Sequence, residues 1–210
     1  MSLQTSREEY IKALKMGQRE ADELVSAGKD PNPQVLDELL PDIDTLTVVD
    51  VGVLEIPAER IVGTKSAGRI AAFSPRFLPL LDPKTEFAGK WISLCDAHLG
   101  TEGIRDPITC YEYLGNFYVQ EGNKRVSVLR YFGAARIPAS VKRVMPPMSD
   151  DPRIVAYYEF VDFFKSAGIY TVQFRRPKDY AKLLALLGKE PGVKWTEDEL
   201  SLIHISEPTR

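Results

Sequence analysis

The fold is decided by the stretch Phe117-Tyr-Val-Gln-Glu-Gly-Asn-Lys-Arg-Val-Ser-Val-Leu-Arg-Tyr-Phe-Gly-Ala-Ala-Arg-Ile-Pro-Ala-Ser-Val141. Its pattern predicts a strand, a tight turn at Glu121-Gly122, a helix that Gly133 ends, and a second strand. We expect these three elements over residues 117–120, 123–131 and 139–144. The chain therefore changes from strand to helix across a single glycine turn.

That glycine turn is the best candidate for a binding site. A helix start leaves backbone N–H groups without partners, and the helix dipole adds about half a positive charge there. Lys124 and Arg125 lie on the same turn. We predict an anion site for phosphate or carboxylate formed by Gly122, Asn123, Lys124 and Arg125. The alternative is a helix start whose cations face only water.

Composition and charge argue against a nucleic-acid-binding protein and against a membrane-spanning one. The 210 residues carry 27 Lys and Arg against 30 Asp and Glu, a net charge of −3, so nucleic acid is not favoured as a partner. No apolar run approaches the ~20 residues of a membrane span, and the polar N-terminus lacks a signal-peptide core. Cys95 and Cys110 are expected to be reduced, buried thiols. We expect a cytoplasmic protein without a membrane span.

Helix and strand signals alternate irregularly along the chain, which predicts an α+β fold. Asp106-Pro107 predicts a short helix ending at Gly115, and residues 169–174 are expected to form a strand. The expected domains are a helical N-terminal extension, a central module, an α/β appendage that starts a truncated C-terminal region, and a tail. Their ranges are 1–44, 45–147, 148–199 and 200–210.

The tail Leu200-Ser-Leu-Ile-His-Ile-Ser-Glu-Pro-Thr-Arg210 resembles one reading frame of a transposase adapter used in sequencing libraries. Before it, Thr196 and Glu199 form a capping box that would begin a new helix. We therefore expect the natural protein to continue beyond residue 199.

The central module resembles a known family. Its motifs are Gly103-Ile-Arg-Asp-Pro-Ile, Tyr118-Val-Gln-Glu-Gly-Asn-Lys-Arg125, Gly133 and Ile137-Pro-Ala-Ser-Val141. Together they resemble the ParB N-terminal and sulfiredoxin fold over roughly residues 48–145. In that family a Gly-x-x-Arg turn holds a nucleotide phosphate, and the matching positions are Gly122 to Arg125. The resemblance adds Arg69, at the end of an earlier loop, and Arg105 as weaker ligand-binding residues.

Over its full length the chain also resembles bacterial proteins in which a ParB-like module precedes a periplasmic-binding-type domain. That domain is related to the basic membrane proteins (BMP family), the nucleoside-binding substrate-binding receptors of ABC transporters. The resemblance implies that the missing C-terminal part is a ligand-binding domain.

The chain departs from the family's enzymes at two points. Sulfiredoxin carries its catalytic cysteine in the glycine turn, where Asn123 and Lys124 stand here, so sulfinic-acid reductase activity is not expected. ParB proteins that hydrolyse CTP carry a second Glu-Asn-x-x-Arg-type box, which the sequence after Val141 lacks. Binding of a nucleotide is therefore expected without its turnover.

The leading hypothesis is a non-catalytic binding or regulatory module for a phosphorylated small ligand or nucleotide. A nucleotide with Mg²⁺ is the candidate bound group, and no metal-ligating residue is predicted in the protein. One alternative is a phosphotransferase or nuclease of the same fold, with Glu121 as general base. Another is a DNA-associated ParB-like regulator, which requires a basic reading element that the sequence does not offer.

Three other clusters are interpreted as structural. Cys95 and His98, three residues apart on a predicted helix, are expected in the core rather than at a metal. The aromatic residues from Tyr157 to Phe164 are expected to form a core or interface, because acidic residues flank them. Arg175-Arg176-Pro-Lys178 is expected to be a solvated turn.

Overall fold

The computed structural model describes residues 3–101, 103–196 and 198–200. Its contacts group into two compact units, Met1–Met145 and Pro146–Arg210. The four predicted domain ranges stay a prediction, and all but the first residue of the adapter-like tail lie outside the described residues.

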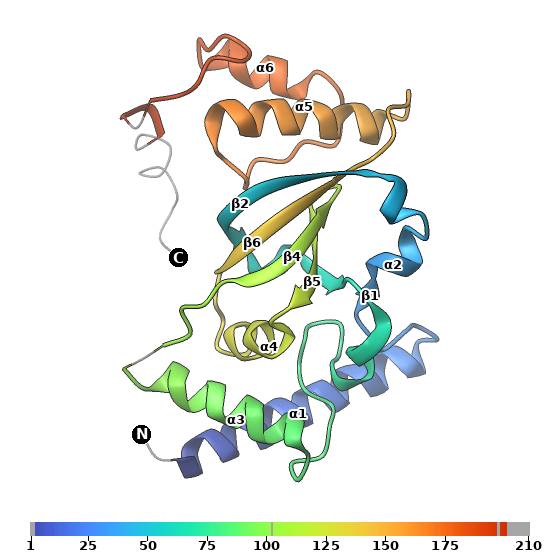
Figure 1. The fold of residues 1–210 in the computed structure, drawn as a ribbon, viewed down its shortest axis with the longest axis vertical. Helices are drawn as coiled ribbons and strands as arrows, with labels where there is room; N and C mark the ends of the chain where they lie inside the picture. Colours follow the sequence, from blue (N-terminus) through green and yellow to red (C-terminus); the bar gives the residue numbers. More distant parts are fainter. Residues whose placement is uncertain (1–2, 102, 197, 201–210) are drawn as a thin grey trace. The chain divides into compact units, whose positions relative to one another are not determined.

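The first unit is built on a six-stranded mixed sheet with the strand order β1-β3-β5-β4-β6-β2 (Figure 1). The central pairs β3–β5 and β4–β6 are parallel, whereas β4–β5 and β2–β6 are antiparallel. A mixed sheet with separate helices is compatible with the predicted α+β class. The strands are β1 (Gln34–Val35), β2 (Thr47–Pro57), β3 (Ile61–Thr64), β4 (Ile108–Tyr113), β5 (Asn116–Glu121) and β6 (Arg136–Met145).

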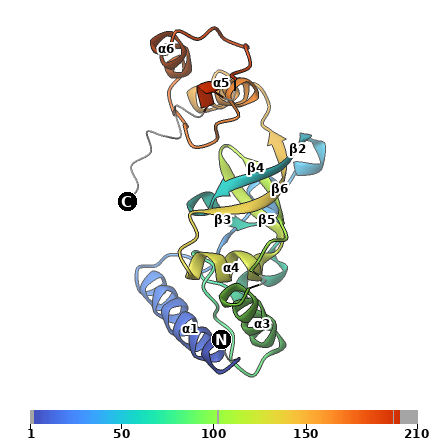
Figure 2. The same ribbon diagram turned by 90° about the vertical axis from the view of Figure 1, so that its left-hand side faces the viewer.

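Three helices of the first unit lie together on one side of this sheet in both ribbon views (Figures 1 and 2). They are α1 (Leu3–Ser26), α3 (Glu86–Leu99) and α4 (Asn123–Tyr131). Their shared core is centred on Trp91, whose indole N–H donates to Ser127 Oγ at 2.8 Å. Cys95 is buried in this core, as the sequence predicted, and burial raises the pKa of its thiol.

A second buried cluster holds the short elements to the sheet. Leu36 of α2 (Leu36–Leu39) and Ile43 of η1 (Ile43–Thr45) pack with Tyr118 and Val144. The remaining 3₁₀ segments are η2 (Ala58–Arg60) and η3 (Ala67–Ala72).

The predictions for the central segment are confirmed. The strand and the helix that flank the glycine turn are β5 and α4, and the second strand is β6, which is longer than expected at both ends. Side chains of β6 from Ile137 to Val141 alternate between buried and half-buried, as expected for a strand with one face in the core.

The helix predicted after Asp106-Pro107 is wrong, because this segment forms β4. Ile108, Cys110 and Glu112 are buried and alternate with half-buried neighbours, which is the period of a strand. Leu114 and Gly115 have φ values of 50° and 82°, and these positive values suit a two-residue hairpin loop between β4 and β5. The hairpin signal therefore outweighs the helix-start signal of Asp-Pro.

A buried ion pair joins β4 to β6. Arg143 Nε donates to Glu112 Oε2 at 2.5 Å, and Glu112 Oε1 accepts a hydrogen bond from the backbone N–H of Gly115 at 2.7 Å. Both side chains are almost fully buried. The carboxylate thus links two neighbouring strands and the hairpin loop, and a buried pair of this kind tolerates the loss of neither partner.

The second unit contains α5 (Pro152–Ala167) and α6 (Asp179–Leu186). Its core is aromatic, as predicted: Phe163 lies 5.1 Å from Tyr180 and 5.8 Å from Trp195, measured between ring centroids. The strand expected over residues 169–174 is wrong. These residues form a loop, and the backbone N–H of Phe174 donates to Tyr180 Oη instead of to a neighbouring strand.

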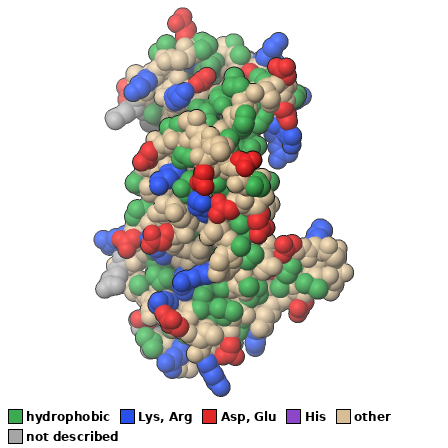
Figure 3. All heavy atoms as spheres, turned by 45° about the vertical axis from the view of Figure 1, so that its right-hand side comes forward, with side chains coloured by type: hydrophobic (Ala, Val, Ile, Leu, Met, Phe, Trp, Pro, Cys, Tyr) green, Lys and Arg blue, Asp and Glu red, His purple; other side chains and the backbone are tan. Residues whose placement is uncertain are grey.

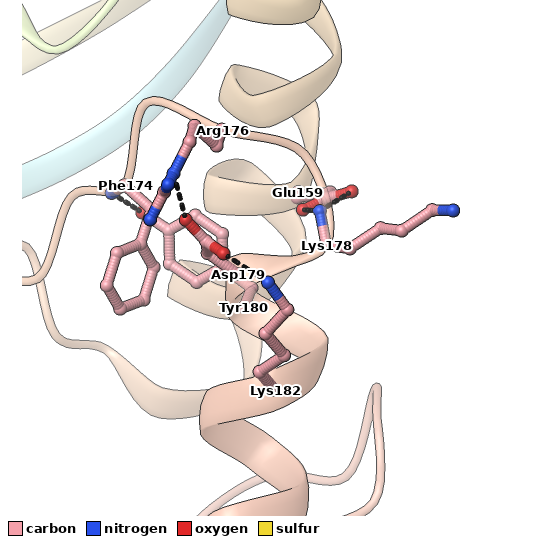
Figure 4. A network of polar contacts seen from close by, with 7 residues as sticks. All are labelled: Glu159, Phe174, Arg176, Lys178, Asp179, Tyr180 and Lys182. Atoms are coloured by element: carbon pink, nitrogen blue, oxygen red, sulfur yellow. Dashed lines mark hydrogen bonds and ion pairs between the residues drawn. The ribbon is translucent and has the colours of Figure 1, made fainter.

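The basic turn before α6 is paired with carboxylates of its own unit (Figure 4). Glu159 accepts the backbone N–H of Lys178 with both oxygens, at 3.0 and 2.8 Å. Asp179 accepts from Arg176 at 3.2 Å and from Lys182 at 2.9 Å, and the bond from Lys182 is the main cause of the lowered pKa of Asp179. Arg175, Arg176 and Lys178 are exposed, which agrees with the predicted solvated turn.

Candidate functional site

A cavity of about 830 Å³ lies in the first unit where five elements meet. The glycine turn between β5 and α4 contributes one wall, the first turns of α3 a second, and β3 with η3 the rest. The side chains of its walls are Thr64, Ser66, Arg69, Phe73, Glu86, Phe87, Lys90, Ser93, Leu94, Val119, Gln120, Glu121, Asn123, Lys124 and Arg125. The predicted anion site therefore lies at a hollow large enough for a small molecule.

Gly122 shapes the turn because any other residue would be strained there. Its φ of 101° and ψ of 16° are left-handed, a conformation that favours glycine. A Cβ at this position would also lie 2.7 Å from Ile108 Cγ2. The turn can thus approach β4 closely while α4 begins at the next residue.

Lys124 and Asn123 follow Gly122 and both line the cavity. Lys124 Nζ lies 5.1 Å from the centroid of the Phe87 ring. Burial lowers the pKa of Lys124, and repulsion from Arg69 and Lys90 lowers it further. Asn123 Oδ1 is buried and has no hydrogen-bond partner within the described part of the chain. An anion placed here would meet a lysine that lies near two other cations.

Arg125 has a structural partner in addition to its place in the cavity wall. Its Nη1 donates to the carbonyl oxygens of Asp106 at 2.9 Å and of Pro107 at 2.7 Å. Its Nη2 lies 4.0 Å from Glu121 Oε1, whose side chain is 78% exposed. The guanidinium therefore ties the start of α4 to the segment that leads into β4.

The other two predicted arginines differ in position. Arg69 lines the cavity from η3, where its φ of −146° and ψ of 17° break the 3₁₀ geometry. Arg105 is exposed and is not part of the cavity wall. The structure thus brings Arg69 and residues 121–125 to one cavity and leaves Arg105 outside it.

Sequence reasoning missed two charged residues of the site, Glu86 and Lys90. An Asp-Pro pair such as Asp82-Pro83 is typical of a helix start, whereas α3 begins at Glu86 after the N-cap Thr85. Glu86 Oε1 and Lys90 Nζ form an (i, i+4) ion pair at 2.6 Å. The (i, i+4) spacing of these opposite charges is the sequence signal that could have found the pair.

The remainder of the wall combines polar side chains with four apolar ones. Phe73, Phe87, Leu94 and Val119 supply hydrophobic side chains next to the cations. The arrangement can hold an anionic group at one end of a ligand and an uncharged body against the rings. Cys95 and Cys110 are not part of this wall, and burial raises the pKa of Cys110 to about 12.

Charge on the surface is mixed. On the face drawn in Figure 3, Lys and Arg side chains are interspersed with Asp and Glu side chains. A duplex or a single strand of nucleic acid is usually bound by a continuous basic stripe.

The described residues contain neither a metal-binding cluster nor a membrane-spanning helix. These residues contain no cluster of three or more His, Cys, Asp or Glu side chains arranged to hold a metal ion. None of their helices combines the length and the apolar composition that crossing a bilayer requires.

Comparisons with known proteins give little. No protein-family model matches the chain, and no curated protein matches it. Among solved structures it is similar to sulfiredoxin from Arabidopsis thaliana, at 21% identity over 42% of this chain and 82% of that chain. The TM-score of 0.29 is too low to carry an argument, so the site rests on its own geometry.

Proposed function

We propose that the first unit binds a small phosphorylated ligand in this cavity, with the phosphate at the start of α4. The observation that carries the proposal is the convergence of three cations from three elements on one cavity. Arg69 comes from η3, Lys90 from α3 and Lys124 from α4. A phosphate has several strong acceptor oxygens and two negative charges near neutral pH, which suits such a set of donors.

Electrostatics supports an anion at this position. Burial is the main cause of the lowered pKa of Lys124, and repulsion from Arg69 and Lys90 lowers it further. A bound anion would relieve that repulsion. The first backbone N–H groups of α4, as at any helix start, have no carbonyl partner within the helix and can donate to an anion. Binding would therefore replace repulsion among cations with attraction to one ligand.

The apolar wall extends the proposal to the body of the ligand. Phe87, Leu94 and Val119 offer a surface on which a ring or an alkyl group can pack. A nucleotide combines such a ring with a phosphate, and it is the ligand class to test first, with and without Mg²⁺. The proposed role is binding and does not require turnover.

The test is a calorimetric titration of the full chain with inorganic phosphate, pyrophosphate and nucleoside triphosphates. We expect Lys124→Gln to weaken binding about tenfold, which corresponds to about 1.4 kcal/mol. The matched control is Lys15→Gln, which removes one positive charge from an exposed position of α1. Release of phosphate is followed in the same samples with and without Mg²⁺.

The outcomes separate the possibilities. Binding that is lost in Lys124→Gln and retained in Lys15→Gln supports the proposed site. Equal weakening in both variants would show a response to net charge alone and would refute the site. Absence of binding for all of these phosphates at millimolar concentration would refute the function itself.

A further inference from the structure

The cations of the cavity are accompanied by a carboxylate that already interacts with them. Glu86 is the first residue of α3, and its Oε1 lies 2.6 Å from Lys90 Nζ. The hydrogen bond with Lys90 is the main cause of the lowered pKa of Glu86, and Lys124 and Arg69 lower it further. The carboxylate of Glu86 therefore interacts with the same three cations that the phosphate would meet.

The effect on Lys124 has the opposite sign. Arg69 and Lys90 destabilise its charged form, whereas Glu86 stabilises it. In the protein without ligand, Glu86 thus compensates part of the repulsion within the cation cluster. A ligand anion that enters the cavity therefore competes with the Glu86 carboxylate for Lys90. The two negative charges also repel each other.

The second carboxylate of the wall is placed differently. Glu121 Oε1 lies 4.0 Å from Arg125 Nη2, and that guanidinium is already held by the carbonyl groups of Asp106 and Pro107. Glu86, in contrast, has its short contact with a cation of the cluster itself. Removal of Glu86 would therefore free a cation of the cluster, Lys90, whereas removal of Glu121 would not.

We propose that Glu86 is an internal competitor of the ligand, which holds Lys90 in an ion pair until an anion displaces it. This inference rests on the proposed function of the cavity. Glu86 would thus lower the affinity of the cavity for anions and raise the ligand concentration at which an anion binds. Both side chains of the pair are largely exposed, at 81% for Glu86 and 62% for Lys90, so exchange of one partner for another requires no unfolding of α3.

The test uses phenyl phosphate as probe, in EDTA, with the full chain. We expect Glu86→Gln to bind the probe about three- to tenfold more tightly than the wild type, because one like charge is removed near the ligand. The gain should shrink at high salt, since exposed charges are screened. The matched control is Glu23→Gln, which breaks an exposed (i, i+4) ion pair with Arg19 on α1, outside this cavity.

A double-mutant cycle with Lys90→Gln completes the test. Removal of Lys90 should cost more affinity in the Glu86→Gln background than in the wild type, because Lys90 is then available to the ligand. Unchanged or weaker binding in Glu86→Gln, beside measurable binding in the wild type, would overturn the inference and leave the proposed function standing. Absence of binding in every variant would overturn both.

Discussion

Gly122 satisfies two separate constraints at the residue scale. Its backbone has a positive φ of 101°, and a Cβ would approach Ile108 Cγ2 to 2.7 Å. The first constraint is shared with other glycines of the chain, whereas the second depends on the close approach of the turn to β4. The two contributions can therefore be separated by experiment.

We predict that Gly122→Ala lowers the free energy of unfolding by about 2–4 kcal/mol, through backbone strain and the clash with Ile108. Gly133→Ala is the control, since Gly133 has a φ of 78° and a Cβ added there would meet no described atom within 4 Å. We expect about 1 kcal/mol for that variant. Urea unfolding measures both, and equal losses would show that the contact with Ile108 carries no cost.

The residue scale also shows what the sequence could not reveal about the site. The glycine turn with its two cations is visible as a motif, since its residues are adjacent. The sequence predicts that Arg125 contacts the ligand, but only the structure shows the carbonyl groups of Asp106 and Pro107 that hold its guanidinium. The approach of Lys90 to Lys124 depends on how α3 packs against α4, and no local pattern encodes it.

At the scale of elements, local signals succeeded where one signal dominated. The helix over Asn123–Tyr131 follows directly from the glycine turn and the position of Gly133. The local signals failed where two of them competed, as in β4. There the alternating burial and the Leu114-Gly115 loop outweighed the helix-start signal of Asp106-Pro107. Pairing between strands supplied the deciding energy there, and a single segment does not show its partners.

The packing of α1 against α4 includes a carboxylate that titrates. Tyr131 Oη donates to Glu9 Oε2 at 2.5 Å, and Lys12 Nζ donates to Glu9 Oε1 at 2.7 Å. The bonds from Lys12 and Tyr131 lower the pKa of Glu9 below its ordinary value of 4.5. A carboxyl group with a lowered pKa stabilises the folded state above its unfolded pKa and loses this contribution as the pH falls through the folded pKa.

We therefore predict that the difference in stability between wild type and Glu9→Gln is largest above about pH 4.5 and shrinks at lower pH. Thermal unfolding between about pH 3 and about pH 7 measures this difference. Glu8→Gln is the control, because Glu8 is exposed on the same helix and its only side-chain hydrogen bond within the described residues is a 3.3 Å contact with Gln4. A stability difference that does not change with pH would mean that Glu9 contributes through packing rather than through its charge.

At the scale of the whole molecule, the division into two units places every residue of the cavity wall in Met1–Met145. The core of this unit comes from its own sheet and helices, and the aromatic core of the second unit comes from α5, α6 and the segments next to them. Among the described residues, the proposed site therefore draws on no side chain of the second unit.

We predict that a fragment of residues 1–145 folds cooperatively and binds phenyl phosphate within about twofold of the full chain, because sites that share no partners behave additively. Circular dichroism on urea titration and calorimetry measure the two properties. The full chain carrying Lys124→Gln is the comparison for lost binding. A folded fragment whose affinity falls about tenfold or more would show that residues after 145 complete the site, and the function would then belong to the whole chain rather than to its first unit.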